Sequence, residues 1–450
     1  MEVSTFDDDL LGLSGFASRL EKFIEIEHHF VQGGLVIALN SRFGSGKTTF
    51  LNMWKAALEN RTDENKPLVI SLNAWESDYY GDPLFAIISS LIESIQSNNE
   101  SANSLISAAK DFGWFATSIG GQVVHKVTGI DAVAAGELAE KKKAIRDAAE
   151  RVPMDTFTIY QGRKNAMVRL RKAIAGFVAA SEPRVLFLVD ELDRCRPDYA
   201  ISYLETIKHI FDLQGAVFVL AADRESLKNS AKTAFGADLD FEEYHRKFVH
   251  REISLPPISE SGYRNIASSY VTQYLERDGL RSCYMSIDAH RIDNIVDLVA
   301  GLKMTPRPIQ EMFRILGHVF ETTEQHKGRL LWCVGLGTIA MAAFKAGNSQ
   351  LFDLLGSRQL EPEEAVQISS KVLKEKYVDW WIILFFTGGG LKVGDEESAQ
   401  DVTTKVGLID KERNSTSLSH LGQWHEGWGG TFSARFPQIH EKIEHISQWN

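Results

Sequence analysis

The chain has 450 residues, of which 44% are hydrophobic and 24% are charged, a balance typical of globular proteins that bury sizeable cores. This composition excludes a disordered or collagen-like chain, and the length favours two to four domains. With 49 Lys and Arg against 60 Asp and Glu, the net charge of −11 excludes an overall positive field that would attract nucleic acid or anionic membranes.

Cysteine usage and the N-terminal residues predict a cytoplasmic protein. Cys195, Cys283 and Cys333 are far apart and show no CxxC spacing, which argues against a disulfide framework or a structural zinc site. The start of the chain is acidic at Asp7–Asp9 and does not resemble a secretory signal. The longest uncharged apolar stretch, Leu330–Phe344, is shorter than the roughly 20 residues of a membrane-spanning helix, so it predicts a buried core helix.

The first half of the chain alternates short apolar runs with helical patterns. An amphipathic helix is expected within 7–30, because Phe16, Leu20 and Ile24 recur at helical spacing. Buried strands that alternate with helices predict an α/β fold, in which a parallel sheet carries helices on both faces. The apolar runs that predict such strands are 34–39, 68–72, 185–189 and 216–221.

A long segment, about residues 97–180, separates the second expected strand from the third. Its first half is rich in Gly and Ala but is interrupted by His125, Lys126 and Asp131. Its second half places Lys141–Lys143 on a helical stretch. We interpret the segment as a helical insertion whose charge run lies on a solvated face; contact with nucleic acid or another partner is the alternative.

A phosphate-binding pattern follows the first expected strand. The residues S-R-F-G-S-G-K-T differ from G-x-x-x-x-G-K-[ST] only by Ser41 at the first glycine position. A loop between a buried strand and a helix turns its backbone N–H groups inward beside the positive helix N-terminus, so it can enclose a phosphate. Lys47 is expected to reach the β- and γ-phosphates, and the Thr48 hydroxyl to coordinate Mg²⁺. The expected nucleotide-binding residues are Ser41, Arg42, Phe43, Gly44, Ser45, Gly46, Lys47, Thr48 and Thr49.

Acidic residues follow the third and fourth expected strands. Asp190 is expected to hold the Mg²⁺ shell together with Thr48. Glu191 is expected to orient and deprotonate the attacking water, with Asp193 as the second candidate for that role. The simpler alternative is that these acids cap the next helix. Asp223 is expected beside the γ-phosphate as a sensor, provided that its strand neighbours the phosphate-loop strand.

Taken together, these stretches resemble the KAP family of P-loop NTPases. Glu191 stands where the family's Asp-Asp-Leu-Asp-Arg-Cys motif has its second Asp. The resemblance covers about residues 7–257 and weakly reaches 305–308. The stretches that carry it are Gly44–Thr48, Asn73–Glu76, Val189–Cys195, Leu204–Lys208 and Phe218–Arg224.

The resemblance implies a P-loop ATPase core with five parallel strands, one of which lies between the phosphate-loop strand and the Asp-bearing strand. The expected domains are this core over 1–257, a helical lid over 258–325 and a mostly helical interaction region over 326–450, about which the resemblance says nothing. The family's lid supplies an Arg to the nucleotide, a role that falls on Arg307 here. Family members often carry membrane helices in the long insertion, but the charged residues interrupt it here, so no membrane span is expected. The candidates for an arginine finger acting in trans are Arg224, Arg246 and Arg251.

The leading functional hypothesis is an ATPase that hydrolyses ATP with Mg²⁺ as a switch or motor and assembles or remodels partner proteins. The similarity to phage-exclusion proteins implies bacterial anti-phage defence, with an effector encoded separately because no effector domain is legible here. ATP is favoured over GTP, since no Asn-Lys-x-Asp guanine reader is evident. The alternatives are a nucleotide-dependent scaffold with little hydrolysis and a small-molecule phosphotransferase. A homo-oligomer and contact with nucleic acid are both compatible with the sequence.

Overall fold

The chain divides into two compact units, one formed by Met1–Asp9 with Leu13–Pro256 and the other by Leu10–Gly12 with Pro257–Asn450. The finer division of the second unit at residue 325 stays a prediction. The computed structural model describes residues 4–41, 44–62, 66–94, 100–117, 156–181, 183–277, 289–321, 331–372, 378–393, 421–430 and 434–447.

The first unit is built on a five-stranded sheet with the strand order β2-β3-β4-β1-β5. All neighbouring strands are parallel, and β4 lies between the phosphate-loop strand β1 and the Asp-bearing strand β3. The predicted P-loop NTPase sheet, with one strand inserted at this position, is therefore confirmed. The strands are β1 (Leu35–Asn40), β2 (Leu68–Asn73), β3 (Val185–Asp190), β4 (Ala216–Ala222) and β5 (Arg251–Ser254).

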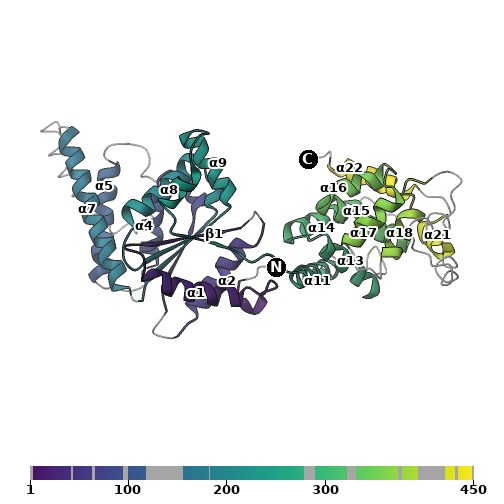
Figure 1. Cartoon of the computed structure of the whole chain (residues 1–450), viewed down its shortest axis with the longest axis horizontal. Helices are drawn as coiled ribbons and strands as arrows, with labels where there is room; N and C mark the ends of the chain where they lie inside the picture. The colour runs from purple at the N-terminus through teal and green to yellow at the C-terminus, as the bar shows by residue number, and fades with distance from the viewer. Residues whose placement is uncertain are drawn as a thin grey trace. The chain divides into compact units, whose positions relative to one another are not determined.

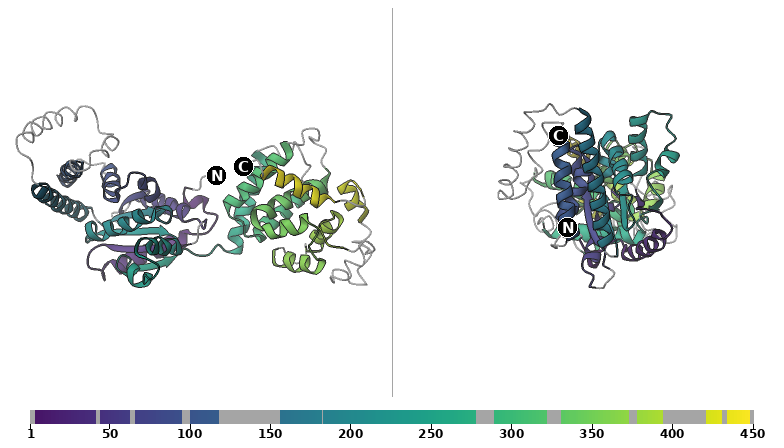
Figure 2. Two further views of the ribbon diagram at one scale, coloured as in Figure 1. Left: turned by 90° about the horizontal axis from the view of Figure 1, so that it is seen from above. Right: turned by 90° about the vertical axis from the view of Figure 1, so that its left-hand side faces the viewer.

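Helices cover both faces of this sheet (Figures 1 and 2). Successive side chains of a strand point to opposite faces, so Val36 and Ala38 face one layer and Leu35 and Ile37 the other, and all four are buried. On the second face Phe16 of α1 contacts Phe50 of α2, with ring centroids 5.2 Å apart. The described helices of this unit are η1 (Phe6–Asp8), α1 (Ser14–His28), α2 (Lys47–Glu59), α3 (Ala74–Asp78), α4 (Pro83–Glu93), α5 (Glu100–Thr117), α7 (Thr156–Ala180), η3 (Leu192–Arg194), α8 (Pro197–Ile210), α9 (Arg224–Phe235) and α10 (Phe241–Arg246).

The described parts of the 97–180 insertion are helical, as predicted. The long helices α5 and α7 pack side by side (Figures 1 and 2). The charge run at Lys141–Lys143 lies outside the described residues, as do His125, Lys126 and Asp131.

Strand β5 is the one strand that the apolar pattern did not locate. It has only four residues, Arg251–Ser254, and three of them are exposed. A short strand at the sheet edge has no need for the continuous apolar run that marks a strand buried on both faces.

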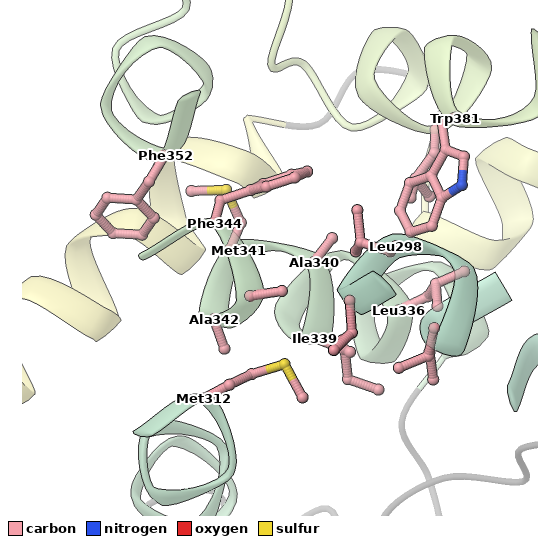
Figure 3. Packing of buried hydrophobic residues seen from close by; sticks show 14 of the residues in the cluster. Leu298, Met312, Leu336, Ile339, Ala340, Met341, Ala342, Phe344, Phe352 and Trp381 are labelled. Carbon is pink, nitrogen blue, oxygen red and sulfur yellow. The ribbon is translucent and has the colours of Figure 1, made fainter. Parts of the chain in front are cut away.

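The second unit is helical around one hydrophobic core. Helix α15 covers the predicted core stretch from Trp332 onward, and its residues from Gly335 to Phe344 are buried, which confirms the prediction over that range. Leu331, just before the helix, is exposed, and Leu330 lies outside the described residues. Met312, Phe352 and Trp381 surround it from three other helices (Figure 3). No helix in the described part of the chain is both long and apolar enough to cross a bilayer. The described helices of this unit are α11 (Glu260–Arg277), α13 (Ala289–Gly301), α14 (Pro306–Glu321), α15 (Trp332–Gly347), α16 (Ser349–Gly356), α17 (Pro362–Val372), α18 (Val378–Thr387), α21 (Leu421–Trp428) and α22 (Arg435–Ser447).

Candidate nucleotide site

The loop from β1 to α2 has the backbone of a phosphate-binding turn. Gly44 and Gly46 have φ values of 78° and 93°, in the left-handed region that side chains disfavour. Gly46 is also the N-cap of α2 and has no side chain that could occupy the first N–H groups of the helix. An anion at this position would therefore meet backbone donors and the positive end of the helix dipole. Arg42 and Phe43 lie outside the described residues.

Ser41, which replaces the first glycine of the pattern, closes this loop through its hydroxyl and its carbonyl group. Its hydroxyl donates to Ser45 Oγ at 2.5 Å. Its carbonyl accepts a hydrogen bond from Lys47 Nζ at 2.8 Å. The Lys47 side chain thus points back over the loop that precedes it in the chain. Thr49, the last of the expected nucleotide-binding residues, is half-buried in the first turn of α2.

Lys47 and Asp193 form a buried ion pair at the carboxyl ends of the parallel strands. Their charged atoms are 3.4 Å apart, and the two side chains are only 9% and 6% exposed. The oxygen that faces Lys47 also accepts the backbone N–H of Asp223 at 2.8 Å. Asp193 therefore joins the phosphate-loop helix, the end of β3 and the end of β4.

Thr48 and Asp190, the two expected Mg²⁺ ligands, lie together. The Thr48 hydroxyl lies beside the Asp190 carboxylate, and the Glu191 backbone N–H donates to Asp190 Oδ1 at 2.8 Å. Burial raises the pKa of Asp190, although Thr48 and the Glu191 N–H oppose the shift. A partly buried carboxylate next to a hydroxyl is a donor set of hard oxygens, which fits Mg²⁺ held jointly by protein and phosphates.

Glu191 has a strained backbone and two side-chain partners. Its φ of 59° lies in the left-handed region, which is unusual for a residue with a Cβ and recurs at functional sites. Oε1 is 3.0 Å from the Arg194 guanidinium, and Oε2 accepts a hydrogen bond from Asn73 Nδ2 at 3.4 Å. Asn73 is paired with Asp190 in the β2–β3 register, which places its amide beside Glu191.

The Asn73 and Arg194 contacts were not predicted from the sequence. Both residues belong to motifs quoted above, but neither motif indicated that the two side chains would share Glu191. The signal that could have identified Asn73 is its position at the end of a buried strand. Using that signal required knowing that β2 pairs with β3.

Asp223 lies at the end of β4, and β4 pairs with β1 as its expected sensor role requires. Its carboxylate caps α9, where Oδ1 accepts the backbone N–H groups of Glu225 and Ser226 at 3.0 and 3.3 Å. Asn40, at the end of β1, accepts the neighbouring N–H of Arg224 at 3.2 Å. The structure therefore brings Asp223 to the correct edge and shows a capping function there.

The candidate arginines differ in their surroundings. The guanidinium of Arg224 binds both Glu242 and Glu252. Arg251 pairs with Glu27 at 2.6 Å, and Arg246 is exposed at the end of α10. Arg307 is exposed at the start of α14, in the second unit. Roles for these four residues in catalysis stay predictions.

The model of the KAP family P-loop domain matches residues 13–322. No curated protein matches the chain. Among solved structures, the chain is similar to the Aeropyrum pernix ORC2 protein in its ADPNP-ADP complexes, with 11% identity, a TM-score of 0.33 and coverage of 97% of this chain and 95% of that one. It is also similar to the Aeropyrum pernix ORC1 protein in complex with DNA, with 12% identity, a TM-score of 0.32 and coverage of 97% and 94%.

Proposed function

Because the chain belongs to the KAP family of P-loop NTPases, we propose that it hydrolyses ATP with Mg²⁺ and uses this cycle to assemble or remodel partner proteins. The observation that carries the proposal is the convergence of Lys47, Thr48, Asp190 and Asp193 at one edge of the parallel sheet. These residues come from the phosphate loop and from the end of β3. Such an edge, outside the carboxyl ends of the strands, is where open α/β sheets bind their ligands.

The phosphate loop supplies binding. The left-handed glycines Gly44 and Gly46 shape the turn, and Lys47 exchanges the Ser41 carbonyl for the β- and γ-phosphates. Thr48 and Asp190 would hold Mg²⁺, which neutralises charge on the phosphate oxygens when it is bound.

Glu191 is the better candidate for the base that activates water. One oxygen of Asp193 already accepts both the Lys47 ammonium and the Asp223 backbone N–H, so this carboxylate positions the loop. Glu191 is more exposed than Asp193, and its two partners are side chains that can move. We therefore assign water activation to Glu191 and a positioning role to Asp193.

A nucleotide-dependent scaffold with little hydrolysis is the second candidate. The observation that favours it is the engagement of both Glu191 oxygens by Arg194 and Asn73. The remaining proposals rest on the family resemblance and on the sequence pattern. They are the anti-phage role, a separately encoded effector, self-assembly, the cytoplasmic location, the lid function of Arg307 and the separate lid and C-terminal regions.

The test is nucleotide binding and hydrolysis by the purified chain with Mg²⁺, using ATP and GTP in parallel. Lys47→Ala is expected to weaken ATP binding by about 100-fold, because it removes a charge-assisted contact to phosphate. Lys55→Ala is the matched control, since Lys55 lies on the same helix and forms an ion pair with Glu59 at the surface. Binding that Lys47→Ala leaves unchanged would refute the nucleotide site. ATP binding without turnover by wild type would favour the scaffold.

A further inference from the structure

We propose that Arg194 is a positioning residue that holds Glu191 in a resting position, and that the exposed Trp75 ring holds Arg194 in turn. This inference deepens the proposed function, because it rests on ATP hydrolysis with Glu191 as the base. It names a control point that the phosphate loop and the acidic residues do not include.

The first step concerns the carboxylate. A base that orients water needs an oxygen directed at that water. Both oxygens of Glu191 are engaged with the protein, Oε1 with Arg194 at 3.0 Å and Oε2 with Asn73 at 3.4 Å. The contact to Arg194 is shorter and joins opposite charges, so it is the stronger of the two restraints.

The second step concerns the guanidinium. The Cζ atom of Arg194 lies 5.6 Å from the centre of the Trp75 ring, within the range of a cation–π interaction. The Trp75 backbone N–H also donates to Asn73 Oδ1 at 3.1 Å, so the residue that places the ring is next to the second partner of Glu191. An aromatic ring, a guanidinium and a carboxylate therefore form one continuous series.

The third step concerns access. Trp75 is 52% exposed although it is a large aromatic residue, and Arg194 is less exposed than the ring that it contacts. A change at the protein surface can thus reach Glu191 through two contacts. None of the three residues belongs to the phosphate loop, so releasing Arg194 is expected to change turnover and to leave ATP binding unchanged.

Arg196 provides a matched control two residues away. It also carries a guanidinium, but its Nε donates to Asp78 at 2.9 Å, and its side chain is 60% exposed. Arg196→Gln and Arg194→Gln remove the same charge from the same segment. Only the second removes a partner of Glu191.

The experiment measures kcat and KM for ATP in the full chain with Mg²⁺. Arg194→Gln is expected to raise kcat about fivefold without changing KM, the factor expected when one partly exposed charged hydrogen bond is lost. Arg194→Lys, which keeps the charge, is expected to lie between wild type and Arg194→Gln. Trp75→Leu is expected to raise kcat in the same direction, whereas Trp75→Phe and Arg196→Gln stay near wild type.

Two further proteins separate the possible failures. Glu191→Gln and the double variant Arg194→Gln/Glu191→Gln are expected to be inactive while still binding ATP. If Glu191→Gln is inactive but Arg194→Gln and Trp75→Leu are no faster than wild type, the restraint is refuted and the ATPase stands. If wild type and Arg194→Gln both bind ATP but neither hydrolyses it, the restraint is likewise refuted. If Glu191→Gln turns over like wild type, the proposed base is wrong. Should Arg194→Gln fail to fold, the kcat values of Trp75→Leu and Arg194→Lys test the restraint in its place.

Discussion

The Thr48 side chain lies beside the Asp190 carboxylate, where the first turn of α2 meets the end of β3. This carboxylate is partly buried, and burial raises its pKa above the ordinary value of 3.8 because the charged form loses hydration. The folded protein therefore binds a proton at Asp190 more tightly than the unfolded chain does. The stability that follows is complete below the ordinary pKa and is lost as the pH rises through the raised pKa.

Replacing this carboxyl group is expected to stabilise the protein when no nucleotide is bound. At pH 7 Asp190→Asn removes a partly buried charge, so its melting temperature without nucleotide is expected to match or exceed that of wild type. With Mg²⁺ and ATP the order is expected to reverse, because a divalent cation favours the carboxylate. Thermal unfolding with and without Mg-ATP measures both effects. Asp111→Asn, at an exposed site, is the control, and equal Mg-ATP stabilisation of wild type and Asp190→Asn would contradict the assignment.

The buried pair of Lys47 and Asp193 predicts strong coupling between two single substitutions. Lys47→Met leaves the Asp193 carboxylate buried without its cation, which is expected to destabilise the protein by about 3 kcal/mol. Adding Asp193→Asn is expected to recover about 1–2 kcal/mol of that loss, as is usual for residues in direct contact. Urea unfolding of the four proteins in this cycle gives the coupling energy. Additive effects on the free energy of unfolding would show that the Lys47 and Asp193 charges do not stabilise each other.

Histidines at the other end of the sheet predict a loss of stability in mild acid. His250 Nδ1 accepts the backbone N–H of Val36 at 3.0 Å, and His28 Nε2 accepts that of Gly215 at 3.3 Å. Burial lowers the pKa of both rings below the ordinary 6.5, so the unfolded chain binds protons that the folded protein excludes. The resulting stability is complete above pH 6.5 and is lost as the pH falls through the lowered pKa values.

Denaturant unfolding between about pH 5 and pH 8, the range in which a histidine usually changes its charge, measures this dependence. His250→Gln is expected to flatten the pH profile, because glutamine does not titrate. His209→Gln, on the exposed side of α8, is expected to keep the wild-type slope. A slope that His250→Gln does not change would show that the pH dependence arises elsewhere.

The core of the second unit predicts a large effect from a single truncation. Phe344 of α15 is buried, and its ring lies 6.0 Å from that of Phe385 of α18 (Figure 3 shows its surroundings). Phe344→Ala is expected to destabilise this unit by about 3–5 kcal/mol, through lost burial and the cavity that remains. Limited proteolysis across a urea series measures the unfolding of the unit. Leu331→Ala, at a half-exposed position, is expected to cost less than about 1 kcal/mol, and equal effects would contradict the core.

The sequence predicted most of what positions the site. Continuous apolar runs identified β1, β3 and β4, because a strand buried on both faces needs apolar residues along its length. The run of β2 was also recognised, although β2 lies at a sheet edge and its Ser71 is exposed. The same reasoning could not identify β5, whose exposed residues at the sheet edge need no such run. The phosphate pattern and the acids after β3 were legible because their chemistry fixes residue type and spacing.

Contacts between distant segments could not be read in this way. The Asn73–Glu191 hydrogen bond depends on the pairing of β2 with β3, and the Arg194–Trp75 contact depends on where α3 begins. Asp223 shows the converse case. Its position after β4 was predicted, but its use as the cap of α9 became visible only with the helix in place.

The most direct test of the central claim is a single turnover of ATP bound to an excess of protein, compared between wild type and Glu191→Gln. If Glu191 activates water in an ATPase, wild type converts bound ATP to ADP, and Glu191→Gln retains intact ATP for at least about 100 times longer. Equal conversion by the two proteins, or intact ATP in both, would contradict the claim.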